Sequence, residues 1–360
     1  MNALGQRIAR LIAAQGPISI AQFMSIALHD PVLGYYATQD PIGRRGDFVT
    51  APEISQMFGE LLGAWIVQAW RDQGSRTPVT LIELGPGRGT LMADVLRAAK
   101  LDPAFLAAIQ VVLVETSAAL RRAQAEKLGS AAVPVRWANR LDESLSEGGP
   151  LFLVANEFFD ALPIRQFVFT ERRWCERMVG SDGRGALTFA LSPQPLPIQP
   201  PPERGKPELG TIYETSGPGE GIVERVAEAI AANGGAALIV DYGYGAKAGF
   251  GETLQAVSRQ RYAGVLDNPG EADLSAHVDF AALAHSAEKG GTRAHGPVGQ
   301  GAFLLSLGIA DRADRLARSN PNQRATIAAA VERLISPLQM GELFKAIAIL
   351  PQAAPVPAGF

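Results

Sequence analysis

The chain has 360 residues, of which 47% are hydrophobic and 19% are charged, and its formal net charge at pH 7 is −3. This composition is typical of a soluble globular protein that is long enough to bury a sizeable core. The basic balance and dense Lys/Arg blocks of a nucleic-acid-binding protein are missing, and no run of about 18 uninterrupted apolar residues predicts insertion into a membrane.

Cysteine and histidine are scarce in this sequence. The single cysteine, Cys175, excludes an intrachain disulfide. With one cysteine and four scattered histidines, a structural metal site is not expected. Residues 1–14 are amphipathic and mildly basic, without the apolar core or cleavage site of a signal peptide. We therefore expect a cytoplasmic protein that holds no metal.

Residues 1–75 are predicted to form an N-terminal helical region. Leu4, Ile8 and Leu11 recur at helical spacing, and Ser19 is placed to cap a second helix. After a turn-rich stretch, residues 53–70 show an amphipathic pattern that predicts one long helix.

From residue 76 to about residue 250, apolar runs alternate with helical patterns. The runs lie at 79–84, 111–114, 133–137, 151–155 and 236–240. Apolar runs without polar alternation indicate strands that are covered on both faces. Their alternation with helices predicts an α/β, Rossmann-like core around a doubly wound parallel sheet.

Two segments interrupt this alternation. Residues 164–190 predict antiparallel strands with a turn at Asp182-Gly183. Residues 191–207 contain seven prolines, which suit neither a helix nor a central strand, and predict an exposed loop. The core therefore carries an inserted antiparallel β segment at about 164–210, and residues 251–360 are predicted to add helices and final strands.

The most informative motif is the glycine-rich turn at 83–90, ELGPGRGT, which follows the first buried strand and opens a helix. Gly85 permits the tight turn, and Gly87 and Gly89 let a ligand approach the backbone where a Cβ would collide with it. The helix start then offers free N–H groups and a partial positive charge. This arrangement predicts a nucleotide-like ligand.

Two ligand classes compete for this turn. A dinucleotide site has G-x-G-x-x-G spacing and places a pyrophosphate over the helix start, whereas the spacing here is G-x-G-x-G. Glu83 lies two residues before the first glycine, and its carboxylate suits an ammonium but repels a pyrophosphate. S-adenosylmethionine (SAM) carries an α-amino group and no phosphate, so the motif favours SAM over NAD(P).

Glu115 supports the same ligand. It ends the second predicted strand, whose carboxyl end lies beside the glycine-rich turn in a doubly wound sheet. A carboxylate there can accept hydrogen bonds from both ribose hydroxyls of SAM. The alternative is that Glu115 is only an acidic residue at a helix start.

Several further segments occur in an order that is specific to one family. They are residues 28–36 (LHDPVLGYY), 46–55 (GDFVTAPEIS), 156–163 (NEFFDALP), 241–244 (DYGY), 269–280 (PGEADLSAHVDF), 300–308 (QGAFLLSLG) and 340–345 (MGELFK). With the glycine-rich turn, they make the chain resemble the MidA-like SAM-dependent methyltransferases over nearly its whole length. The resemblance implies a seven-strand methyltransferase sheet and SAM as the cofactor.

The same resemblance suggests a substrate. The family includes a mitochondrial arginine methyltransferase that acts in the assembly of respiratory complex I. It therefore implies protein arginine N-methylation, with a complex I core subunit or a similar protein as the partner. A homodimer through the C-terminal helices is a further possibility.

The segment before the long helix is interpreted as a lid over the donor. Asp47 is expected to meet the SAM amino group, Phe48 to cover its sulfonium or ring, and Thr50 to complete the contact. The alternative is a simple helix start, in which Thr50 caps and Pro52-Glu53 fill the first turn.

Asn156, Glu157 and Asp160 follow the fourth strand, at the edge of the sheet where the methyl group is expected. A carboxylate can hold the planar guanidinium of arginine bidentately, so Glu157 and Asp160 are candidate catalytic residues. Asn156 is a candidate for both catalysis and cofactor binding through its side-chain oxygen. The alternative is that Asn156 or Asp160 caps a helix.

Asp241 and Tyr242 end the next buried strand and are candidates for substrate binding, as is His277 further on. Asp241 is equally suited to cap a loop, and His277 to a structural role. Two other functions remain open: a SAM-binding assembly chaperone without essential catalysis, and an NAD(P)-dependent oxidoreductase.

Overall fold

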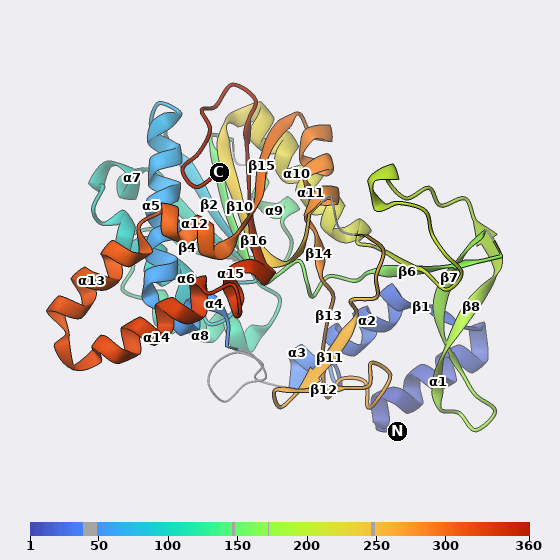
Figure 1. The fold of residues 1–360 in the computed structure, drawn as a ribbon. Coiled ribbons are helices and arrows are strands. Elements are labelled where there is room, and N and C mark those ends of the chain that lie inside the picture. The colour runs from blue at the N-terminus through green and yellow to red at the C-terminus, as the bar shows by residue number, and fades with distance from the viewer. Residues whose placement is uncertain (39–48, 146–147, 172, 246–248) are drawn as a thin grey trace. The chain divides into compact units, whose positions relative to one another are not determined.

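The computed structural model describes residues 1–38, 49–145, 148–171, 173–245 and 249–360 of the chain. They group into two compact units (Figure 1). Unit 1 comprises Met1–Phe48, Asp160–Gly219 and Tyr244–Asp279, and unit 2 comprises Val49–Phe159, Glu220–Gly243 and Phe280–Phe360. The second and third segments of each unit are thus separated in the sequence by a segment of the other.

The largest sheet has the strand order β15-β16-β10-β5-β2-β3-β4, and β14 also pairs with β10. Its strands are β2 (Val79–Leu84), β3 (Ile109–Val114), β4 (Val135–Ala138), β5 (Leu151–Asn156), β10 (Gly235–Tyr244), β14 (Val278–Asp279), β15 (Thr292–Gly299) and β16 (Phe344–Pro351). The pairs from β10 to β4 along this order are parallel, whereas β16 is antiparallel to both β10 and β15. The predicted α/β fold is confirmed. Within the described residues its sheet is mixed and has eight strands, where seven were expected.

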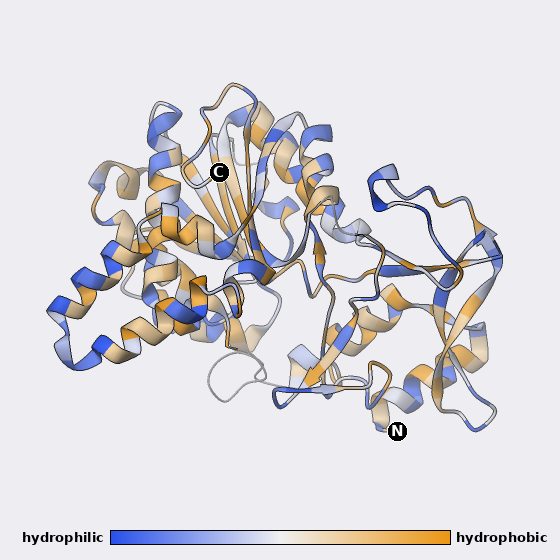
Figure 2. Cartoon of the chain, viewed as in Figure 1, coloured by the Kyte–Doolittle hydropathy of each residue, from blue (hydrophilic) through white to orange (hydrophobic). Residues whose placement is uncertain are grey.

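Continuous apolar runs form the central strands because both faces of this sheet are covered. Every residue of β2 and β5 is buried. Side chains alternate between the two faces of a strand, so an apolar residue is needed at each position. Figure 2 shows these strands in mainly hydrophobic colours.

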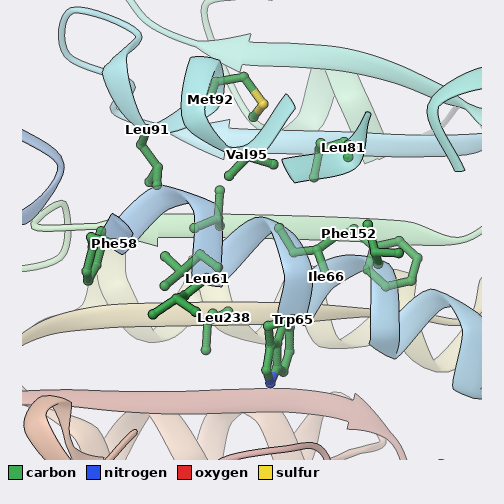
Figure 3. Packing of buried hydrophobic residues seen from close by; sticks show 14 of the residues in the cluster. Phe58, Leu61, Trp65, Ile66, Leu81, Leu91, Met92, Val95, Phe152 and Leu238 are labelled. Atoms are coloured by element: carbon green, nitrogen blue, oxygen red, sulfur yellow. The ribbon is translucent and has the colours of Figure 1, made fainter. Parts of the chain in front are cut away.

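One face of the sheet packs against helices α5 (Gln56–Asp72) and α6 (Thr90–Ala99). Phe58, Leu61, Trp65 and Ile66 of α5 meet Leu91, Met92 and Val95 of α6 over the strand residues Leu81, Phe152 and Leu238 (Figure 3). Burial of a side chain of this size contributes roughly 1.5–3 kcal/mol. The contact fixes α6, and with it the turn that leads into α6.

The segments of the chain that contribute strands to this sheet also contain further helices. They are α4 (Ala51–Ile54), α7 (Pro103–Ala108), α8 (Ala118–Leu128), α9 (Asp142–Leu145), α10 (Gly217–Asn233), α11 (Phe280–Lys289), α12 (Gln300–Ser306), α13 (Ile309–Ser319), α14 (Arg324–Ile335) and α15 (Met340–Leu343), with a 3-10 turn at Pro321–Gln323. Helices α10 and α11 lie on the opposite face of the sheet from α5 and α6 (Figure 1).

Unit 1 is built from short helices and antiparallel strands. Its helices are α1 (Ala3–Gln15), α2 (Ile20–His29) and α3 (Tyr35–Thr38), with a 3-10 turn at Pro202–Arg204. A five-stranded sheet has the order β1-β7-β6-β9 with β8 beside β7, and a three-stranded sheet has the order β12-β11-β13. These strands are β1 (Ile18–Ser19), β6 (Arg165–Thr170), β7 (Arg173–Ser181), β8 (Leu187–Leu196), β9 (Ile212–Thr215), β11 (Gln255–Ser258), β12 (Arg261–Ala263) and β13 (Asp273–Ser275).

Two sequence predictions differ from this structure. The long helix predicted over 53–70 is two helices, because Ser55 is extended and caps α5 through the N–H of Met57. Residues 191–196, predicted as part of a loop, belong to β8, where Pro193 and Pro195 are accommodated because, among the described strands, β8 pairs with β7 alone. Proline is tolerated on such an edge strand.

Candidate functional site

The glycine-rich turn joins β2 to α6 through three residues with left-handed backbone. The φ angles are +60° at Gly85, +52° at Gly87 and +76° at Gly89, values that favour glycine. Gly89 is the N-cap residue of α6 and has no side chain to cap the helix. Apart from the N–H of Met92, which Glu83 accepts, the first N–H groups of α6 can meet a ligand. Gly85 is exposed, and a Cβ on it would lie 2.8 Å from the ring of Phe158.

Glu83, two residues before this turn, is only 2% exposed. Its carboxyl accepts a hydrogen bond from the backbone N–H of Met92 in the first turn of α6, while burial raises the pKa of Glu83 to about 8. Among the described residues its buried Oε2 atom has no hydrogen-bond partner. A buried acid that lacks a cation is expected to be protonated at neutral pH and to ionise when a cation binds beside it.

Glu115 directly follows β3 and is half-buried. It accepts a hydrogen bond from the N–H of Ser117 at 2.7 Å and from the Gln124 side chain at 3.3 Å. Burial raises the pKa of Glu115, while these hydrogen bonds oppose the rise. The same Gln124 amide donates to the carbonyl of Gly87 at 2.7 Å.

Gln124 is therefore a site residue that the sequence did not reveal. It is fully buried in α8, and Trp137 donates to its oxygen at 2.8 Å. Gln124 ties Glu115 to the glycine-rich turn and so fixes their separation. The one signal in the sequence was a polar residue on the buried side of a helix, which no motif marks as functional.

Asn156 and Glu157 lie at the carboxyl end of β5. In the register of β2 and β5, Leu84 is opposite Ala155, so Asn156 is beside Gly85. Asn156 donates to Glu157 Oε1 at 3.0 Å, and its own buried Oδ1 has no hydrogen-bond partner within the described chain. The opposite amide orientation would turn that oxygen toward the carboxylate, which electrostatics disfavours.

Glu157 has a left-handed φ of 50°, a rare conformation for a residue with a side chain. Such strain persists only where the surroundings hold it and is common at functional sites. The N–H of Glu157 donates to the carbonyl of Val240 at 2.9 Å, and its Oε1 also accepts the N–H of Ala51 at 2.9 Å. The carboxylate is thus fixed at the edge of the sheet.

Helix α4 is attached at two points to this edge. Glu157 holds its first N–H group, and its Glu53 accepts a hydrogen bond of 2.5 Å from the hydroxyl of Thr90. Lys127 donates to the same hydroxyl at 2.6 Å. Thr50 makes no capping hydrogen bond through its side chain. Glu157 takes the capping role that the sequence suggested for Thr50.

Asp241 and Tyr242 end the part of β10 that lies in unit 2. Asp241 is fully buried, and its Oδ2 accepts the N–H groups of Phe158 and Phe159 at 3.1 and 2.9 Å. Its Oδ1 accepts the N–H of Tyr242 at 2.9 Å. This arrangement orients the segment after β5. The Tyr242 ring is buried against Phe344.

Asp160 and His277 belong to unit 1. The carbonyl of Asp160 accepts the N–H of Ala276 at 2.9 Å, and its side chain is buried. The N–H of His277 donates to the hydroxyl of Thr253 at 2.9 Å. Burial lowers the pKa of His277, against the opposing charge of Glu214.

Two predicted cofactor residues, Asp47 and Phe48, lie outside the described residues. Within the residues that the structure does describe, no group of His, Cys, Asp or Glu side chains is placed to hold a metal ion. None of the described helices is long and apolar enough to cross a membrane.

Comparison with known proteins gives a family for this geometry. Residues 61–298 match the family described as "Putative S-adenosyl-L-methionine-dependent methyltransferase". A Burkholderia thailandensis protein crystallised with S-adenosyl-homocysteine has a similar structure, with a TM-score of 0.83 and 31% identity over 99% of this chain and 94% of that chain. The predicted family and its cofactor are confirmed, and the oxidoreductase alternative is set aside.

Curated relatives extend over almost the same length. The Danio rerio protein arginine methyltransferase NDUFAF7, mitochondrial, is 39% identical over 96% of this chain and 86% of its own. The Homo sapiens protein of that name is 37% identical over 94% of this chain and 81% of its own. These names contradict the predicted cytoplasmic location. That prediction depended on a low cysteine count and the lack of a signal peptide, neither of which identifies one compartment among the reducing ones.

Proposed function

This chain belongs to the family of SAM-dependent methyltransferases, and from that premise we propose that it N-methylates an arginine side chain of a protein partner. The observation that carries the proposal is the carboxylate of Glu157. It is held by two donors at the end of β5, next to the strand that carries the glycine-rich turn. The names of the curated relatives support the same substrate class.

The described residues fit SAM in three ways. The buried Oε2 of Glu83 and Oδ1 of Asn156 are acceptors without partners in the described chain, and the α-ammonium of SAM supplies donors. Glu115 is placed beside the turn for the ribose hydroxyls. Gly85 and Gly87 have the left-handed backbone that the tight turn requires, and Gly85 is exposed. Thr50, Asp47 and Phe48 stay proposed contacts from the segment before α4.

When bound, SAM supplies a methyl group on a positively charged sulfur. Glu157 would hold the guanidinium so that one nitrogen points at this methyl, which is a matter of proximity and alignment. As the nitrogen–carbon bond forms and the sulfur–carbon bond breaks, the nitrogen loses a proton that Glu157 can accept. The hydrogen bonds from Asn156 and Ala51 keep the carboxylate from rotating away.

The other proposed roles are of two kinds. Asp241 is proposed to act on substrate through the segment 158–159, which it holds by two hydrogen bonds. Asp160, Tyr242 and His277 are proposed to contact the protein substrate.

We propose a core subunit of respiratory complex I, or a similar protein, as the partner. The three-part division at 1–75, 76–250 and 251–360 and a homodimer through the C-terminal helices are likewise proposals.

The test uses cells that lack the gene and carry either the wild type or the Glu157→Gln variant. Mass spectrometry of arginine peptides should show mono- or dimethylation only with the wild type, while titration calorimetry shows SAM binding to both proteins. Glu126→Gln makes the same substitution at an exposed residue, and this control variant should behave as wild type. Arginine methylation that persists with Glu157→Gln would contradict the proposed role. If the Glu157→Gln variant restores the phenotype of cells that lack the gene without restoring arginine methylation, the function of an assembly chaperone would be favoured.

A further inference from the structure

Arg204 lies in the proline-rich segment that follows β8 in unit 1. Its neighbours Pro202, Glu203 and Gly205 are exposed, but the Arg204 side chain is only 6% exposed. Long cationic side chains are rarely buried unless they are paired. One arginine of a mostly exposed segment is therefore held inside the unit, and Ile198, Pro200 and Pro207 of the same segment are half-buried.

The guanidinium of Arg204 is surrounded by groups that suit this cation. It forms an ion pair with Asp279 and donates to the carbonyl of Gly249 at 3.1 Å. It also lies over the rings of Tyr213 and Tyr244, at 5.3 and 5.1 Å from their centroids. A carboxylate, a carbonyl and two aromatic faces recognise a flat, delocalised cation and discriminate against the compact ammonium of lysine.

Arg204 is also the attachment of its segment. Within the described chain, the hydrogen bonds that leave residues 197–207 for other parts of unit 1 come from this side chain. The backbone bonds of the segment are local, such as Gly205 to Pro202, and its prolines have no N–H to donate. A Cβ on Gly205 would have no heavy atom within 4 Å. Release of the guanidinium would therefore leave the segment held by the packing of its half-buried Ile198, Pro200 and Pro207.

Two of the residues that surround Arg204 lie close in sequence to residues proposed to contact the substrate. Tyr244 is the last residue of β10, two positions after Tyr242, and Asp279 is two positions after His277. Tyr244 belongs to the segment 241–244 and Asp279 to the segment 269–280, both separate from the glycine-rich turn at 83–90. The surroundings of Arg204 are thus built by the parts of the chain that are proposed to meet the protein partner.

We propose that Asp279, Tyr213, Tyr244 and the carbonyl of Gly249 form an arginine-binding site, and that Arg204 fills it as an internal ligand until an arginine of a protein partner displaces it. Residues 197–207 then act as a strap that is released when the partner binds. Only the identity of the partner rests on the proposed methyltransferase function; the site and the strap do not.

Limited digestion of the intact protein with an arginine-specific protease tests the exchange. The Arg204–Gly205 bond is protected while Arg204 is bound, and the Arg184–Gly185 bond, in the exposed turn between β7 and β8, serves as the internal control. Millimolar N-acetyl-arginine-methylamide should raise the ratio of the two cleavage rates by about tenfold, as a competitor for the same site would. The lysine analogue should leave the ratio unchanged.

Two variants complete the test. Asp279→Asn should raise the ratio without any probe, and Arg204→Ala should bind the blocked arginine, measured by titration calorimetry, while SAM binding stays as in wild type. If the blocked arginine binds more tightly than free arginine, the natural ligand is an arginine within a protein chain. If free arginine binds more tightly, the ligand is a free amino acid, and the proposal of a protein partner is overturned. A ratio that no probe changes, or a folded Arg204→Ala that binds no arginine, would show a permanent structural ion pair and overturn the site.

Discussion

Glu83 in β2 and Glu157, which directly follows the neighbouring strand β5, are two carboxylates near the carboxyl ends of these strands, and they are held in opposite ways. Burial raises the pKa of Glu83 to about 8, and its carboxyl accepts the N–H of Met92. Glu157 is half-buried and accepts the N–H of Ala51 and the amide of Asn156. A buried acid with few donors favours its neutral form, whereas donors to a carboxylate favour the charged form.

This difference suits two different cations. Glu83 is prepared for an ammonium that arrives inside the protein and restores its charge, which agrees with the α-amino group of SAM. Glu157 is an oriented carboxylate at a more open position, which agrees with a guanidinium that enters and leaves with a substrate. Local packing, more than the residue type, thus distinguishes the acid proposed to bind the donor from the acid proposed to bind the substrate.

The largest expected effect comes from Glu157→Ala. Loss of the carboxylate that aligns the guanidinium and takes its proton should lower the rate of arginine methylation by about 10²–10³-fold. The affinity for SAM should change little, because the proposed donor contacts are Glu83, Glu115 and the glycine-rich turn. Rate assays with the methylated partner and calorimetry with SAM measure both. Equal losses in SAM affinity and rate would remove the distinction between the two acids.

Glu83→Gln should change how stability depends on pH. Because the folded-state pKa of Glu83 is raised from 4.5 to about 8, its contribution to stability is fully present below the unfolded pKa and is lost as pH rises through the folded pKa. The wild type should lose on the order of 1–3 kcal/mol of unfolding free energy between these values, and Glu83→Gln should lose less. Denaturant unfolding at several pH values gives the comparison, and saturating SAM should reduce the wild-type loss. Identical pH profiles would show that Glu83 is charged throughout.

Gly85→Ala tests whether the turn must be open. A side chain at φ +60° costs roughly 1–2 kcal/mol, and the new Cβ would meet Phe158 at 2.8 Å. We expect SAM to bind about tenfold more weakly, a loss that calorimetry detects. Gly183→Ala is the matched control, since its Cβ would have no neighbour within 4 Å. Unchanged SAM affinity in Gly85→Ala would place the donor elsewhere.

The smallest expected effect concerns the link between α4 and α6. Thr90→Val and Glu53→Gln each weaken the hydrogen bond of 2.5 Å between these side chains. The two losses of unfolding free energy should not add, and their coupling should be about 1 kcal/mol. Thr90→Ser, which keeps the hydroxyl, should restore most of the stability. Additive losses would show that Glu53 and Thr90 act independently and that α4 is positioned by Glu157 alone.

The sequence predicted the parts of the site that depend on local pattern. The apolar run at 79–84 is β2, and the glycines that follow have the left-handed backbone that makes glycine necessary. The run at 151–155 is β5 with one more residue. These features are local because a strand covered on both faces needs apolar residues throughout, and the turn needs residues without a Cβ.

The contacts between distant segments were beyond the sequence. Gln124 reaches Gly87 from the middle of α8, and Asp241 accepts the N–H groups that follow β5. Nor did the pattern indicate that Ser55 divides one amphipathic stretch into α4 and α5. The contacts of Gln124 and Asp241 depend on tertiary packing, for which neither hydrophobic periodicity nor motif spacing provides a signal, whereas Ser55 is a local cap that the continuous apolar pattern obscured.

The central claim is that this chain transfers the methyl group of SAM to an arginine whose guanidinium Glu157 holds in place. The most direct measurement incubates the purified protein with methyl-labelled SAM and an extract of cells that lack the gene, followed by acid hydrolysis and amino-acid analysis. The account predicts label in methylarginine with the wild type and its loss with Glu157→Gln. Label in another amino acid, or methylarginine formed equally by both proteins, would contradict it.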